Sequence, residues 1–111
     1  MGKESLGEFE EMVLLMVILL KEDAYGLAIC DALKKQTNRA ATIGAVHATL
    51  NRLESKGFVE SHLGDPTKER GGRRKRLFLP TAFGKKVLTE SRDVKVNIWM
   101  QIPELSIKSI L

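Results

Sequence analysis

The chain has 111 residues, 43% of them hydrophobic and 29% charged, with a net charge of +4, which suits one globular domain with a single modest core. Its longest apolar run, Met12 to Leu20, has nine residues, whereas a membrane span needs about 18, so we expect no membrane partner. One cysteine, Cys30, excludes an internal disulfide, and the acidic amino terminus is unlike a secretory signal, so we expect a cytoplasmic protein.

The first predicted helix begins at the capping box Ser5-Leu6-Gly7-Glu8, in which the serine hydroxyl and the glutamate carboxylate accept free N–H groups. The acids Glu8, Glu10 and Glu11 also suit the positive end of the helix dipole. We therefore expect the helix to start here and to end at Lys21-Glu22-Asp23.

The body of this helix, Met12 to Leu20, is apolar on nearly every side. A helix of this kind has to be covered all round, and a domain of this size is too small to cover all of it. We therefore expect a second subunit to cover the remainder, and we place Leu15 and Leu19 at that dimer interface.

A second helix is predicted over Tyr25–Thr37, with Asp23 as its cap. Asn38 suits the left-handed turn that closes a helix. The predicted apolar stripe consists of Tyr25, Ile29 and Leu33.

The third predicted helix is capped by Thr42 and ended by Gly57. Its apolar side chains cluster within about 80° on a helical wheel and predict a core face. The other side is small or hydrogen-bonding, so its backbone could approach the major groove of DNA, about 12 Å wide. The alternative is an ordinary amphipathic helix with a short-residue solvent face. The core face is Ile43, Val46, Leu50 and Leu53, and the other side with its flanks is Gly44, Ala45, His47, Ala48, Asn51, Arg52 and Ser55.

Residues 58–63 and 76–79 are predicted strands of a hairpin. The turn residues Gly64-Asp65-Pro66 and Gly71-Gly72 lie between them.

Basic charge is concentrated in the middle of the chain. Residues 68–76 hold six bases and one acid, and residues 24–56 hold five bases and two acids, whereas residues 1–23 hold two lysines and six acids. This distribution favours a polyanionic partner, double-stranded DNA. The alternative for residues 68–76 is a solvated loop.

A fourth helix is predicted from Thr81, which can cap it, after Pro80, to Pro103. The order of helix, helix, helix, strand, wing, strand and helix is that of a winged helix-turn-helix. We predict a mainly α fold with a small β-hairpin: a DNA-binding part over residues 1–80 and a C-terminal dimerisation helix and tail over 81–111, in one compact unit. The apolar side of the fourth helix is Val87, Leu88, Val94, Ile98 and Trp99, of which the last three are assigned to the dimer interface.

Four segments in this order resemble the PadR family of winged-helix transcriptional regulators over nearly the whole chain. They are LGEFEEMVLLMVILL, EDAYGLAI, IGAVHATLNRLESKGFV and GDPTKERGGRRKRLFLPTAFGKKVL. The resemblance implies a DNA-binding repressor that acts as a homodimer through its first and last helices. The chain departs from the family at His47, where tyrosine is usual, and at Ala82, where the pattern Thr-Pro-x-Gly has proline.

Contacts that position the protein on DNA are expected at helix starts and on the wing, and contacts that read bases are expected on the third helix. Tyr25 is assigned to a phosphate or, equally, to partly buried packing. His47 is assigned to a phosphate or a base, the alternative being an exposed side chain without a role. The predicted DNA-binding set is Tyr25, Thr42, Gly44, Ala45, His47, Ala48, Asn51, Arg52, Arg73, Arg74 and Lys75.

The chain has no spacing typical of a metal site, no nucleophile–base pair and no nucleotide-binding loop, so we predict no enzyme, no metal and no cofactor. Trp99 has two interpretations: packing between subunits or, as the resemblance implies, lining a cavity for a flat hydrophobic effector. The alternative function is a winged-helix protein-interaction module without specific DNA binding. The four bases over residues 73–76 favour DNA.

Overall fold

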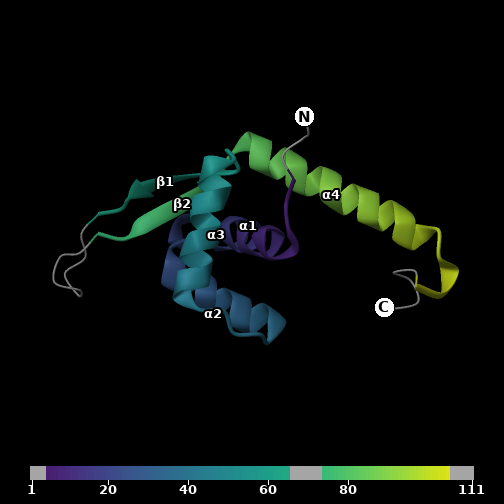
Figure 1. The fold of residues 1–111 in the computed structure, drawn as a ribbon, viewed down its shortest axis with the longest axis horizontal. Coiled ribbons are helices and arrows are strands. Elements are labelled where there is room, and N and C mark those ends of the chain that lie inside the picture. Colours follow the sequence, from purple (N-terminus) through teal and green to yellow (C-terminus); the bar gives the residue numbers. More distant parts are fainter. Residues whose placement is uncertain (1–4, 66–73, 106–111) are drawn as a thin grey trace.

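A computed structural model of the chain describes residues 5–65 and 74–105. Figure 1 shows three helices gathered into one body, a hairpin that extends from it on one side and a last helix that extends on the other. This arrangement confirms the predicted winged helix-turn-helix. The elements are α1 (Glu8–Leu20), the 3-10 turn η1 (Lys21–Asp23), α2 (Gly26–Thr37), α3 (Ile43–Ser55), β1 (Val59–Leu63), β2 (Arg76–Pro80), α4 (Ala82–Met100) and the 3-10 turn η3 (Pro103–Leu105).

The core lies between α1, α2, α3 and the hairpin. Phe58 and Phe78 are its largest fully buried side chains. They pack with residues that each helix of the body contributes, such as Leu14, Ile29 and Leu50. Burial of such apolar area is the main force that holds the three helices and the wing together.

The predicted apolar face of α3 is confirmed at Val46, Leu50 and Leu53, which are fully buried. The prediction for Ile43 is wrong, since 45% of this residue is exposed. Ile43 occupies the first position of α3, and its Cδ1 faces the backbone of Gly26 at the start of α2 rather than the core.

The predicted capping box at Ser5 is wrong in position. Gly7 is the N-cap of α1, and its N–H donates to Oε1 of Glu10 at 2.8 Å. The carboxylate three residues beyond the cap therefore belongs to Glu10 and not to Glu8. The reason is tertiary: Lys56 from α3 also donates to Glu10, and this contact fixes the carboxylate at the helix start.

The predicted cap of α2 is also wrong. Asp23 lies in η1, where its backbone carbonyl accepts the N–H of Tyr25 at 3.0 Å. Tyr25 has an extended backbone and is the N-cap of α2, with no side chain capping the helix. Pairing with the hairpin explains the difference, because Tyr25 forms a bridge with Leu77 of β2.

Other helix ends follow the sequence. Thr42 and Thr81 cap α3 and α4, with their hydroxyls accepting the N–H groups of Ala45 at 3.0 Å and Gly84 at 2.9 Å. Asn38 closes α2 in the left-handed conformation at φ 59°. Thr81 thus caps without the family's proline after it.

The hairpin is antiparallel, with Val59 opposite Pro80 and Leu63 opposite Arg76. Its first strand begins one residue later than predicted, because the N–H of Phe58 donates to the carbonyl of Leu53 at 2.8 Å and closes the end of α3. The predicted wing tip, including Arg73, lies outside the described residues.

The helix α4 begins on the body and then leaves it. Its first turns are anchored where Gly84 and Leu88 are buried. From Arg92 to Met100 every residue is exposed. Figure 1 shows this part of α4 projecting away from the three-helix body. Within residues 5–65 and 74–105, no helix is both long and apolar enough to cross a membrane.

Candidate nucleic-acid interface

The solvent face of α3 gathers most of the predicted DNA-binding residues on one surface. This face lies beside the start of α2 and the base of the wing, and it has little side-chain bulk in its first two turns. The backbone of α3 is therefore accessible to a large partner. Its exposed members are Gly44, Ala45, His47, Ala48, Asn51, Arg52 and Ser55.

His47 marks the edge of this face toward α2. A Cβ built on Gly26 would lie only 2.8 Å from two atoms of the His47 ring, so the ring rests against the glycine backbone. A side chain at position 26 would displace the exposed His47 ring from this place. The imidazole is thus held at the junction of two helix starts, where first-turn N–H groups favour anions.

The wing approaches α2 at the same end of the molecule. Nζ of Lys75 lies 4.1 Å from the ring centroid of Tyr25, a cation–π contact. Tyr25 is half-buried, which favours the packing interpretation of its ring. That packing places a wing cation beside the uncapped start of α2.

Two further wing cations differ in their surroundings. Arg74 is exposed. Arg76 donates through Nη1 to Oγ of Ser61 at 2.6 Å, and Ser61 donates to Glu54 at 2.8 Å. Arg76 is therefore engaged within the protein, whereas Arg74 is free to meet a phosphate.

Arg52 lies on the opposite edge of the α3 face, toward α1. Its Nε donates to Oε2 of Glu10 at 3.4 Å, and its Nη2 donates to Oγ1 of Thr49 at 3.0 Å. The sequence indicated Glu10 only as an acid near a helix start. In the structure its carboxylate is buried and faces two cations, Arg52 and Lys56. Burial favours a higher pKa for Glu10, but the Gly7 N–H and the cations of Lys56 and Arg52 outweigh it and hold the pKa below the ordinary value of 4.5.

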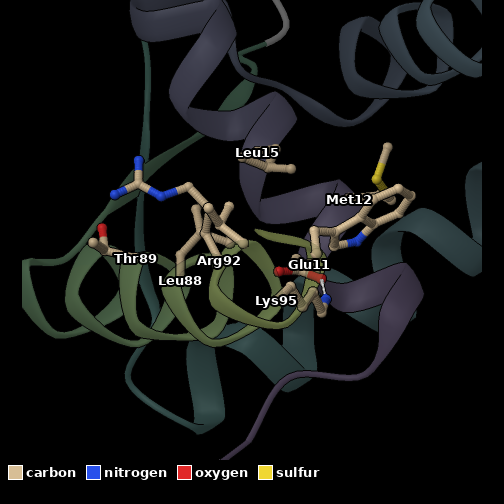
Figure 2. Close-up of a pocket in the computed structure, with 9 residues that line it drawn as sticks. Glu11, Met12, Leu15, Leu88, Thr89, Arg92 and Lys95 are labelled. Atoms are coloured by element: carbon tan, nitrogen blue, oxygen red, sulfur yellow. Dashed lines mark hydrogen bonds and ion pairs between the residues drawn. The ribbon is translucent and has the colours of Figure 1, made fainter. Parts of the chain in front are cut away.

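A second surface lies between α1 and α4, at a cavity of about 590 Å³ whose lining residues are drawn in Figure 2. The ion pair of Glu11 and Lys95, 2.8 Å long, joins the two helices at this cavity. Leu15, Trp99 and seven other residues line it, including Met12 and Leu88, which the sequence did not indicate for this surface. The five residues predicted for the dimer interface are all exposed in the single chain: Leu15, Leu19, Val94, Ile98 and Trp99.

In the described part of the chain, no three His, Cys, Asp or Glu side chains gather as metal ligands would. The three-helix body, the wing and the accessible face of α3 define a winged helix-turn-helix protein that binds DNA. The profile of the transcriptional regulator PadR-like family matches residues 14–90. The chain therefore belongs to the PadR-like family and is a DNA-binding transcriptional regulator.

Individual relatives agree with this assignment. An uncharacterized protein of Lysinibacillus sphaericus is 30% identical over 94 residues, which cover 83% of this chain and 80% of the relative. A PadR family transcription regulator of Clostridium difficile is 29% identical, with a TM-score of 0.58 over 85% of this chain and 91% of that one. A PadR-like regulator of Bacillus cereus, 20% identical, has the same fold with a TM-score of 0.68 over 87% of this chain and 89% of that one.

Proposed function

We propose that this protein is a cytoplasmic, non-enzymatic repressor that binds an inverted-repeat operator as a homodimer. The observation that carries the proposal is the exposed face of α3, small in its first turns and beside a wing cation, Lys75, that is fixed on Tyr25. A helix of this shape fits the major groove, while cations at its margins meet the phosphates.

The proposed contacts divide by chemistry. Thr42 and Gly44, at the start of α3, approach a phosphate through backbone N–H groups. Asn51 reads a base, since its amide can pair with the edge of adenine in two hydrogen bonds. Gly44, Ala45 and Ala48 allow the close approach, and Arg73, Arg74 and Lys75 bind the backbone beside the groove.

The wing provides the first test. In the double variant Arg74→Gln and Lys75→Gln, affinity for duplex DNA should fall for every sequence, because cations on phosphates contribute through counterion release. The slope of log affinity against log salt should become shallower by about 1 to 2 units, measured by fluorescence anisotropy.

A matched control removes the same charge elsewhere. Lys85 and Lys86 are exposed on the first turns of α4, so Lys85→Gln with Lys86→Gln should leave the salt slope nearly unchanged. If both double variants behave alike, the wing does not bind phosphate. If the intact protein binds no duplex, the protein-interaction module becomes the better function.

The cavity between α1 and α4 supports a second function, the binding of a flat hydrophobic effector. Its lining is mainly apolar and includes Trp99, the single tryptophan of the chain. A planar aromatic dye such as 1-anilinonaphthalene-8-sulfonate should quench the Trp99 emission saturably. An emission spectrum that the dye leaves unchanged would contradict the effector site.

A further inference from the structure

We propose that Glu10 and Thr49 are positioning residues that hold Arg52 at the margin of the α3 face and turn the outer edge of its guanidinium toward a DNA phosphate. The inference rests on the proposed DNA binding and adds to it two residues that never touch DNA themselves. Glu10 lies in α1, 42 positions away from Arg52 in the sequence.

The contacts of Arg52 occupy only part of its guanidinium. The group has five N–H donors in a rigid plane. Two of them are used within the protein, by Nε toward Glu10 at 3.4 Å and by Nη2 toward Thr49 at 3.0 Å. The side chain remains 55% exposed, so its outer edge is open to an acceptor outside the protein.

The two acceptors are themselves fixed. The side chain of Glu10 is only 9% exposed and also accepts the Gly7 N–H at 2.8 Å. Both of its oxygens accept from Nζ of Lys56, at 3.1 and 3.0 Å. Thr49 is 1% exposed, so its hydroxyl has little freedom to move. Arg52 has therefore lost much of its side-chain freedom before DNA arrives, and less is lost on binding.

The charges of the cluster show that Glu10 positions Arg52 without cancelling its positive charge. Glu10 carries one negative charge and faces two cations, of which Lys56 at 3.0 Å is nearer than Arg52 at 3.4 Å. The cluster keeps a net positive charge, and Arg52 is its more exposed cation. That positive charge lies beside the α3 face. A DNA phosphate at the edge of the groove has the negative charge and the oxygen acceptors that the guanidinium of Arg52 can bind.

The test compares Glu10→Gln, Arg52→Gln and their combination in the intact protein, with a duplex obtained by selection from random sequence. Arg52→Gln should weaken binding and reduce the salt slope by about 0.9, the value for one phosphate contact. Glu10→Gln should weaken binding by about three- to tenfold, although removal of an acid alone would tighten it. In the Arg52→Gln background, Glu10→Gln should cause no further weakening and should leave binding unchanged or slightly tighter.

Glu8→Gln is the matched control, because it removes the same charge from an exposed side chain in the same first turn of α1. It should leave binding unchanged or slightly tighter. Thr49→Val removes an acceptor of Arg52 without a change of charge, and it should also weaken binding only while Arg52 is present. Unfolding midpoints of all variants verify that each protein is folded at the temperature of the assay.

Additive effects of Glu10→Gln and Arg52→Gln would overturn the proposal, because a merely structural role weakens binding equally in both backgrounds. Equal or tighter binding by Glu10→Gln, or an unchanged salt slope of Arg52→Gln, would also overturn it. These failures differ from failure of the proposed function, in which the unaltered protein itself binds no duplex.

Discussion

Gly84 lies where α4 packs directly on the backbone that follows α3. A Cβ at this position would overlap the carbonyl of Phe58, a backbone atom that cannot turn aside. The same carbonyl accepts the N–H of Thr81 at 3.0 Å, and the Thr81 hydroxyl donates to the carbonyl of Gly57 at 2.7 Å. Thr81 and Gly84 together therefore fix where the start of α4 is anchored on the body.

Gly84→Ala should lower the free energy of unfolding by about 2 to 3 kcal/mol, because the added methyl forces α4 away from Phe58. Urea denaturation followed by circular dichroism measures the change. Gly44→Ala is the control, since nothing lies within 4 Å of a Cβ there. It should raise stability by about 0.5 to 1 kcal/mol through helix propensity. A stable Gly84→Ala protein would show that the helix start can shift.

The caps of α3 and α4 could be predicted from the sequence because such a cap is a contact between residues three positions apart. The predictions at Thr42 and Thr81 are confirmed for this reason. The caps predicted at Ser5 and Asp23 are wrong because contacts with Lys56 and with β2 decide where α1 and α2 begin.

Ile43 could not be placed in the same way. On a helical wheel Ile43 lies on the same side as the buried residues of α3. It is exposed because the first turn of α3 extends beyond the core, and how far a helix extends depends on how the helices pack.

Among the elements, α1 and α3 are tied by ionic contacts as well as by the core. Glu10 at the start of α1 accepts from Lys56 at the end of α3, and Lys56 also donates to the carbonyl of Ser5 at 3.1 Å. These bonds fix the end of α3 against the start of α1. The sequence indicates both helices, but nothing local pairs residues 46 positions apart.

The stability of this contact should depend on pH. The pKa of Glu10 is lower in the folded protein than its ordinary value of 4.5, despite burial, because the Gly7 N–H, Lys56 and Arg52 favour the carboxylate. Its contribution is therefore fully present above pH 4.5 and is lost as the pH falls through the lowered folded pKa.

Glu10→Gln should accordingly lower the free energy of unfolding by about 1 to 2 kcal/mol at neutral pH, and the difference from the unaltered protein should shrink in acid. Urea titrations at a series of pH values measure it. Glu11→Gln, whose partner Lys95 is largely exposed, should cost less than about 0.5 kcal/mol. A pH-independent difference for Glu10→Gln would mean that the charge of Glu10 is not what stabilises the contact.

As a whole, the single chain is elongated. Its radius of gyration is 16.1 Å, compared with about 13 Å for a compact domain of this length. The projecting part of α4 contributes to this elongated shape (Figure 1), and it carries Val94, Ile98 and Met100 as exposed apolar side chains. The apolar surplus of α1 and α4 was predictable from composition, whereas the cavity between them depends on the angle at which α4 leaves the body.

The exposed apolar surface favours a two-fold dimer. Complete burial of one such side chain contributes about 1.5 to 3 kcal/mol, and the total stability of a small domain is about 5 to 15 kcal/mol. Leu15 and Leu19 on α1 are exposed as well and add to the surface that a second copy would cover. A two-fold axis through this surface would present two α3 helices to successive turns of DNA, as an inverted-repeat operator requires.

Ile98→Glu should therefore break the proposed dimer and leave the monomer folded, because Ile98 is 52% exposed in the single chain and contributes little to its core. A carboxylate buried at the interface without a partner should raise the dissociation constant by more than about tenfold, measured by sedimentation equilibrium. Leu63→Glu, at an equally exposed position of the wing (53%), should leave dimerisation unchanged. Operator binding should weaken in parallel for Ile98→Glu, since each monomer then holds only one half-site. A folded monomer of the unaltered protein at micromolar concentration would contradict the dimer.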